Sequence, residues 1–208
     1  MAAVAAYLAE LAQSRPDVAP ALGELAELHA RKLYHELTLK LEEVVAAPAF
    51  SKPGDDVLVS LYSHVVVDVA DRLSQLRLAH IAVAVSSRIV DPAAALAFLD
   101  AAAEKVAAQP GAAAPLLYVR MHAALLRLQA GDLAAAKQAV AEGRSTLDGL
   151  VEADSTVHAA VYFVAAQVAK AKQEFAEFYK AGVLYLAHVA AEALPEATKL
   201  VRSRTLGH

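Results

Sequence analysis

Hydrophobic residues recur at helical spacing along most of the chain. Leu58, Leu61, Val65 and Val69 follow an i, i+3, i+7, i+11 pattern, and a second stripe contains Leu78, Ile81, Val85 and Ile89. Such spacing places the apolar side chains on one face of a helix. No Asn-Gly or Gly-Gly dipeptide marks a tight β-hairpin. The pattern therefore predicts an all-α protein.

Breaks in this pattern delimit the first expected helices. A short helix is expected from about residue 2 to 13, ended by Ser14, Arg15 and Pro16. A second apolar pattern runs from about 22 to 47 and stops before Pro48. Residues 37–41 alternate as in a strand, but the following glutamates and the length of the run favour one helix. Residues 48–56 form the clearest predicted loop.

The downstream helices carry stronger boundary signals. Asp91 followed by Pro92 is typical of an N-cap and first helical position, and the Gln109-Pro110-Gly111 break ends that helix. The helix that follows this break ends at Gly131, and Asp132 caps the next helix. Further helices are expected from Ser155 and near Glu174, with a final short segment from Pro195.

Alternate helices begin at a regular interval. The predicted starts at Pro92, Leu133 and Phe175 are separated by 41 and 42 residues. Two helices per repeat of about 40 residues are typical of helical-repeat proteins. We therefore expect a right-handed solenoid of tetratricopeptide-like helix pairs. Residues 1–50 would form N-terminal helices and a loop, and residues 51–208 the helical-repeat arm.

Composition narrows the class of protein further. The chain is 58% hydrophobic with a mean hydropathy of +0.40. However, its longest charge-free stretch, 155–169, includes polar residues and falls short of the roughly 20 apolar residues of a membrane span. The residues up to Leu11 lack the basic start of a signal peptide. A net charge of −4 with scattered Lys and Arg argues against nucleic-acid binding. We interpret the chain as soluble and intracellular.

Candidate chemistry is sparse. The chain has no cysteine, and its eight histidines lack the spacing of a metal site. Asp55 and Asp56 are interpreted as helix-capping residues rather than as a general acid and base. No nucleophile elbow or phosphate loop is present. The sequence therefore predicts no catalytic, cofactor-binding or metal-binding residues, and leaves the partner-binding residues unidentified.

Two features of the last helices invite a structural interpretation. The aromatic side chains concentrated there could line a peptide groove, but their helical spacing favours packing between repeats. They are Tyr162, Phe163, Phe175, Phe178, Tyr179 and Tyr185. Gly182 lies inside the last predicted helix, where a glycine usually destabilises. We expect Gly182 to allow a close crossing of two helices.

Several segments resemble, in order, the family of non-ATPase regulatory subunit 13 of the 26S proteasome. Residues 32–39, Lys-Leu-Tyr-His-Glu-Leu-Thr-Leu, are similar to that family's Lys-Leu-Trp-His-Gln-Leu-Thr-Leu segment. Further similarities follow at similar spacing, and the resemblance covers about residues 24–207. They lie at 91–106, at Gly131-Asp132-Leu133 with Lys137, at Val157-His158 with Tyr162, and at 178–180.

This resemblance implies a helical-repeat arm and a non-catalytic scaffold in the lid of the proteasome regulatory particle. The implied partners are other lid subunits and the neighbouring ubiquitin-receptor subunit, in the cytoplasm and nucleus. The PCI module of the family is expected to be absent from this chain, which would then be a fragment, a truncated gene product or a short form. A free-standing tetratricopeptide-like adaptor that binds peptides remains the alternative, and a helical enzyme with dispersed residues is a third.

Overall fold

The computed structural model describes residues 2–50 and 56–189, which are all-α. Within each of the two compact units of the chain, helices that are neighbours in the chain pack against one another, so the predicted helical-repeat fold is confirmed. The chain divides into two compact units, Met1–Pro110 and Gly111–His208. None of the helices in the described part of the chain is long and apolar enough to cross a membrane.

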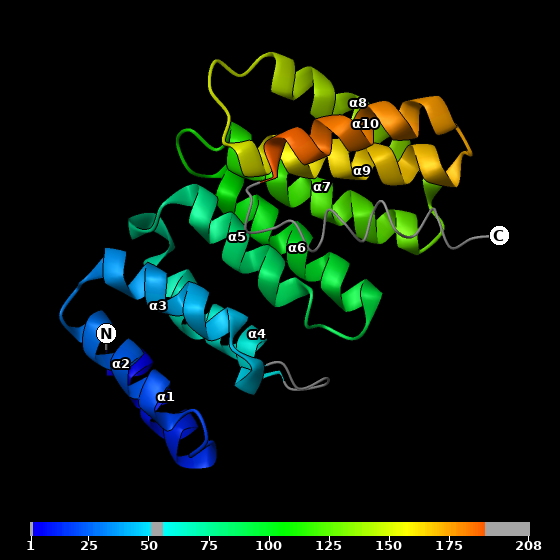
Figure 1. Cartoon of the computed structure of the whole chain (residues 1–208). Coiled ribbons are helices and arrows are strands. Elements are labelled where there is room, and N and C mark those ends of the chain that lie inside the picture. The colour runs from blue at the N-terminus through cyan, green and yellow to red at the C-terminus, as the bar shows by residue number, and fades with distance from the viewer. Residues whose placement is uncertain (1, 51–55, 190–208) are drawn as a thin grey trace. The chain divides into compact units, whose positions relative to one another are not determined.

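The first unit contains six α-helices with irregular helical turns between the third and the fifth. They are α1 (Ala2–Ser14), α2 (Ala19–Ala30), α3 (Tyr34–Ala46), the turn η1 (Pro48–Phe50), α4 (Val57–Leu61), η2 (Tyr62–Val66), η3 (Val67–Arg72), α5 (Gln75–Ser86) and α6 (Pro92–Ala107). In chain order, α1 packs on α2, α2 on α3, α3 on α5 and α5 on α6 (Figure 1). Large aliphatic side chains fill the core: Leu22, Leu25, Leu37, Leu41, Leu61 and Leu99 are fully buried.

The single helix expected over residues 22–47 is wrong, because the chain breaks between α2 and α3. Lys32 adopts a left-handed conformation, with a φ of 56°. The Lys32 amide donates to the His29 carbonyl at 3.1 Å, and the Leu33 amide to the Leu28 carbonyl at 3.0 Å. This pair of bonds is a Schellman motif, which usually has glycine at the left-handed position. The break therefore lacks the residue that normally announces it.

The stripe from Leu58 to Val69 is buried, as its spacing predicts, but the helix that carries it is irregular. After five α-helical residues, η2 widens into a π-helical turn and η3 tightens into a 3₁₀ helix. Hydrophobic spacing indicates which side chains face inward, but it does not specify whether each turn is α-helical, π-helical or 3₁₀. The change of winding was therefore not predictable from the stripe.

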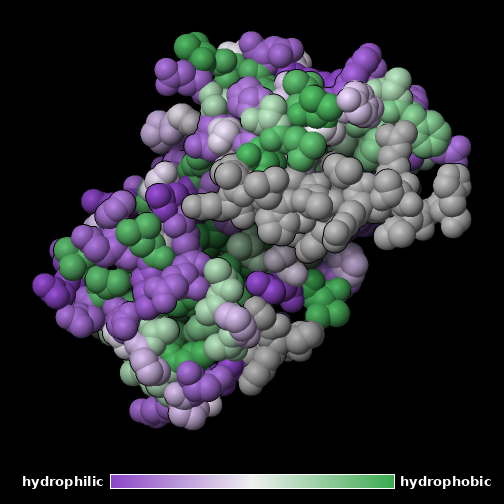
Figure 2. Space-filling view, in the orientation of Figure 1, coloured by the Kyte–Doolittle hydropathy of each residue, from purple (hydrophilic) through white to green (hydrophobic). Residues whose placement is uncertain are grey.

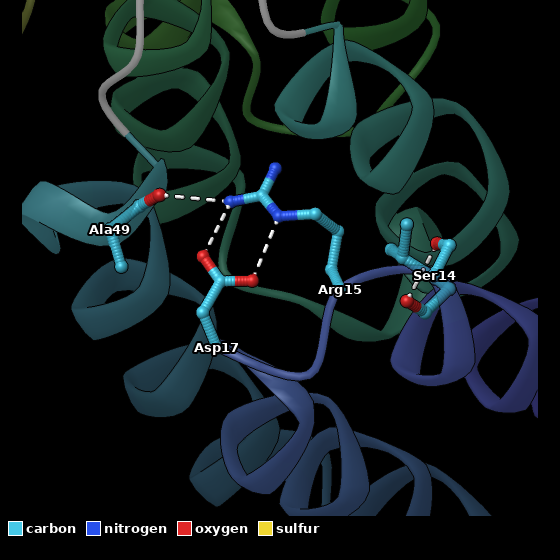
Figure 3. A network of polar contacts seen from close by, with 5 residues as sticks. Ser14, Arg15, Asp17 and Ala49 are labelled. Carbon is cyan, nitrogen blue, oxygen red and sulfur yellow. Dashed lines mark hydrogen bonds and ion pairs between the residues drawn. The ribbon is translucent and has the colours of Figure 1, made fainter.

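Polar contacts tie separate elements of the first unit together. Arg15 forms a two-bond ion pair with Asp17, both at 2.9 Å, and also donates to the Ala49 carbonyl at 3.2 Å (Figure 3). His29, buried in α2, lies 3.1 Å from a carboxylate oxygen of Asp68 in η3. These contacts link the α1–α2 connection to η1 and α2 to η3.

The second unit is more regular. Its described residues form α7 (Ala113–Gln129), α8 (Leu133–Asp148), α9 (Ser155–Ala171) and α10 (Phe175–His188). Adjacent helices pack on one another, and α7 also packs directly on α9. The predicted starts at Leu133 and Phe175 are confirmed, as is the start at Pro92 in the first unit. The prediction for the segment from Pro195 lies outside the described residues.

Acidic caps fix several helix starts. As predicted, Asp91 accepts from the amides of Ala93 and Ala94 at 3.2 and 3.1 Å, and Asp132 accepts from the Ala135 amide at 2.9 Å. Asp154 does the same for α9, through the Thr156 amide at 2.8 Å. Each bond satisfies an amide that has no partner within its helix.

The expectation for Gly182 is wrong, and a different glycine has the close contact. A Cβ added at Gly182 would meet nothing within 4 Å. A Cβ at Gly143 in α8 would lie 2.9 Å from Cε of Met121 and 3.3 Å from Cδ1 of Leu117, both in α7. Gly143 therefore allows α8 to approach α7 closely. Helical periodicity locates a glycine inside a helix but does not say which face meets a neighbour.

Candidate interaction surface

The described residues offer no group for metal chemistry. No three His, Asp or Glu side chains gather closely enough there to hold a metal ion. Two of the histidines pack against tyrosine rings. His64 stacks on Tyr7 with ring centroids 4.4 Å apart, and His122 packs against Tyr118 at 4.7 Å. These are packing contacts within each unit.

The acidic pairs also have structural partners. Glu42 forms an ion pair with Arg77, which joins α3 to α5, and Glu43 lies 3.0 Å from Lys40. Asp56 occupies the N-cap position of α4, but its side chain makes no capping hydrogen bond there, so the capping interpretation is not supported for this residue. Asp55 lies outside the described residues.

Four of the five exposed large hydrophobic side chains of α10, all except Leu184, lie on one side of the helix. They are Phe175, Tyr179, Val183 and Leu186, which are 61%, 66%, 48% and 39% exposed. Their spacing of four, four and three residues places them along one stripe of the helix. We call these four residues the α10 stripe. Hydrophobic residues reach the surface over α10 among hydrophilic neighbours (Figure 2).

The opposite face of α10 is the one that holds it in the unit. Phe178, Ala181 and Tyr185 are buried, and the ring of Tyr185 lies 5.3 Å from that of Phe163 in α9. The prediction that the aromatic residues pack between helices is therefore correct for Phe178 and Tyr185. It is wrong for Phe175 and Tyr179, which project from the outer face.

A helix that is apolar on two faces usually has neighbours on both. In α10, one apolar face meets α9, and the α10 stripe is exposed in the described residues. Exposed aromatic and aliphatic side chains in one stripe are typical of a protein–protein contact, because large rings bury much area at low entropic cost. The sequence contained the signal for this surface as a second stripe of helical spacing beside the buried one.

A small hollow lies beside the inner face of α10. It has a volume of about 310 Å³ and is lined mainly by rings, including Tyr118, His122, Phe163, Tyr185 and His188. Burial raises the pKa of Tyr118 to about 12, so its hydroxyl stays neutral at physiological pH. Sequence reasoning did not bring these residues together, because they come from three different helices.

Comparison with known proteins assigns this arrangement to a family. The family model of PSD13 N-terminal repeats matches residues 21–207. Two relatives from Arabidopsis thaliana, 26S proteasome non-ATPase regulatory subunit 13 homologs A and B, are each 36% identical over 196 residues. That alignment covers 93% of this chain and 50% of each relative.

A more distant relative supports the same assignment. The 26S proteasome non-ATPase regulatory subunit 13 of Dictyostelium discoideum is 24% identical over 193 residues, or 91% of this chain and 49% of that protein. The chain thus spans about half the length of the curated relatives it matches. The match to the family model covers most of the chain. The chain belongs to the family of proteasome non-ATPase regulatory subunit 13, whose N-terminal repeats it contains.

Proposed function

We propose that this protein is a structural subunit of the lid of the 26S proteasome regulatory particle and contributes to ubiquitin-dependent protein degradation as a scaffold. The observation that carries the proposal is the 36% identity, over 93% of the chain, to proteins named as regulatory subunit 13. Their names describe them as non-ATPase regulatory subunits, and we propose a non-catalytic role here.

The architecture supports a role in holding other proteins. Helical repeats present extended surfaces whose side chains are not needed for the core of each repeat. In the second unit, α10 packs on α9 through one face and carries the α10 stripe on the other. We propose that other lid subunits, and the ubiquitin-receptor subunit beside them, are the partners, and that the α10 stripe takes part in this contact.

The competing function is a free-standing adaptor for short peptides. Such a protein would use a groove with a basic or aromatic lining, whereas the α10 stripe projects outward from a single helix. The hollow of about 310 Å³ is partly lined by rings and lies at the lower end of the size range of ligand pockets. The family relationship favours the lid subunit.

Affinity purification tests the proposal directly. The protein, tagged at its own locus, should enrich lid subunits over an untagged control, and should appear in the cytoplasm and nucleus as a fluorescent fusion. Quantitative mass spectrometry of the eluate measures the enrichment. Recovery of a different set of proteins, with no lid subunit above background, would overturn the assignment and favour the adaptor.

A further inference from the structure

Two histidines form the contact between α9 and the end of α10. The rings of His158 and His188 stack with centroids 4.6 Å apart and planes within 11°. Tyr162, one turn further along α9, extends the stack, and its ring centroid lies 5.7 Å from that of His188. Neutral aromatic rings at these separations attract each other. The stack therefore joins the two helices while both imidazoles are neutral.

The surroundings of His158 oppose a positive charge. Its Nδ1 atom is buried and has no hydrogen-bond partner in the described part of the chain. A neutral imidazole leaves one ring nitrogen as an acceptor, but a protonated one carries a hydrogen on both nitrogens. Protonation would thus place a hydrogen on Nδ1 with no acceptor for it. An unpaired buried polar group destabilises the folded state, and more so when the group is charged.

We propose that the His158–His188 stack makes the packing of α10 on α9 sensitive to pH, firm when both rings are neutral and weakened when both are protonated. Two imidazolium rings at 4.6 Å would repel each other.

Other titratable groups face this stack. The carboxylate of Asp154, at the start of α9, favours protonation of His158 and so opposes the effect of burial on this ring. Burial and the proximity of His188 outweigh it, and the pKa of His158 is lowered. From α7, Tyr118 and His122 line the hollow together with His188, and α10 adds Tyr185. His122 is the third imidazole in this cluster and is included in the test.

The direction of the effect follows from proton linkage. A histidine side chain in an unfolded chain takes up its proton near pH 6.5. The folded stack resists the second proton, so the folded state binds fewer protons than the unfolded one below that pH. The stack therefore contributes fully to the stability of the folded state above about pH 6.5, and this contribution is lost as the pH falls below that value.

Hydrogen exchange of the full chain at pH 7.5 and 5.5 measures this effect. After correction for the intrinsic rates, the amides of α10 should exchange several-fold faster at pH 5.5, relative to those of α7. His188→Phe keeps a ring in the stack but cannot be protonated, and should remove most of this pH dependence. His122→Phe shows how much of it the third imidazole contributes. The matched control is His35→Gln on the exposed face of α3, which should behave as the unmodified protein does.

A double-mutant cycle makes the test specific to the pair. His158→Phe, His188→Phe and the double variant should show a repulsive coupling between the two positions at pH 5.5 that is absent at pH 7.5. If phenylalanine at 188 disturbs the fold at pH 7.5, His188→Gln replaces it. The proposal is overturned if α10 shows no pH dependence in the unmodified protein, or if the coupling is the same at both pH values.

Discussion

The two units of this chain reach stability by different means. The first unit buries large leucines and connects its elements through polar contacts such as His29 with Asp68 and Glu42 with Arg77. Its helices are interrupted by π and 3₁₀ turns. As far as residue 189, the second unit has four uninterrupted helices of 14 to 17 residues. Its core is rich in small residues, including Ala123, Ala124, Ala136, Ala165, Ala166 and Gly143.

This difference indicates how each unit responds to substitution. Removing volume damages a core of large side chains most, because a cavity remains. Adding volume damages a core of small residues most, because the helices are already close. The following predictions test this contrast, from the largest expected effect to the smallest.

The largest effect is expected in the leucine core of the first unit. Leu41→Ala should lower the free energy of unfolding by about 2–5 kcal/mol, since Leu41 is fully buried in α3. Leu39, two residues away on the same helix, is 44% exposed and serves as the matched control. Chemical denaturation measures both variants. Equal losses for Leu41→Ala and Leu39→Ala would contradict the burial of this face.

In the second unit, a larger side chain at a close helix crossing should destabilise the fold. Gly143→Leu would press against Met121 and Leu117 and should destabilise by about 1–3 kcal/mol. Gly182→Leu, in α10, meets no atom within 4 Å of its new Cβ and should leave the melting temperature unchanged or raise it. Thermal unfolding of the two variants compares the sites. The assignment of the close crossing fails if Gly182→Leu is the more damaging change.

Substitutions at helix caps should have smaller effects on stability, and they allow a matched comparison between the two units. Asp132→Ala removes a capping bond to the Ala135 amide and should cost about 1 kcal/mol. Asp56→Ala removes a side chain that makes no such bond at the start of α4, so its effect should be smaller. Urea titration resolves the difference. A larger loss for Asp56→Ala would mean that its carboxylate has a role at this helix start.

The smallest predicted effect concerns the helix ends. The left-handed position is Lys32 after α2, Gly131 after α7 and Gln173 after α9, and each belongs to a Schellman motif. Glycine adopts this conformation without the strain of a Cβ. Gln173→Gly should therefore stabilise by roughly 0.5–1 kcal/mol, and Gly131→Ala should destabilise by a similar amount. Calorimetry would contradict this explanation if both changes had the same sign.

These helix ends also show how far the sequence could predict the fold. The break after α7 was predictable because Gly131 and Asp132 supply a stop signal followed by a start signal. The break at Lys32 has the same backbone geometry but no glycine or proline, so the pattern continued through it as one helix. The start of α10 was predictable despite Gln173, because the helical spacing of apolar residues begins again at Phe175 and Phe178.

The candidate surface was less predictable than the fold. Spacing identified Phe175 and Tyr179 as members of a helical stripe, but it could not say whether that stripe faces α9 or the outside. Both faces of α10 are apolar, and only their packing distinguishes them. The stack of His158 on His188 depends on the register of two helices, which single-residue patterns do not contain.

The most direct test of the proposed function combines the tagged protein with a variant of its candidate surface. Tyr179→Ser, Val183→Ser and Leu186→Ser together should leave the fold intact, since these side chains are 66%, 48% and 39% exposed and none belongs to the buried core. Ala176→Ser with Ala187→Ser, also exposed on α10, is the matched control. We expect lid subunits to co-purify with the unmodified protein and the control and to be depleted with the triple variant. Absence of lid subunits from all three purifications would contradict the account.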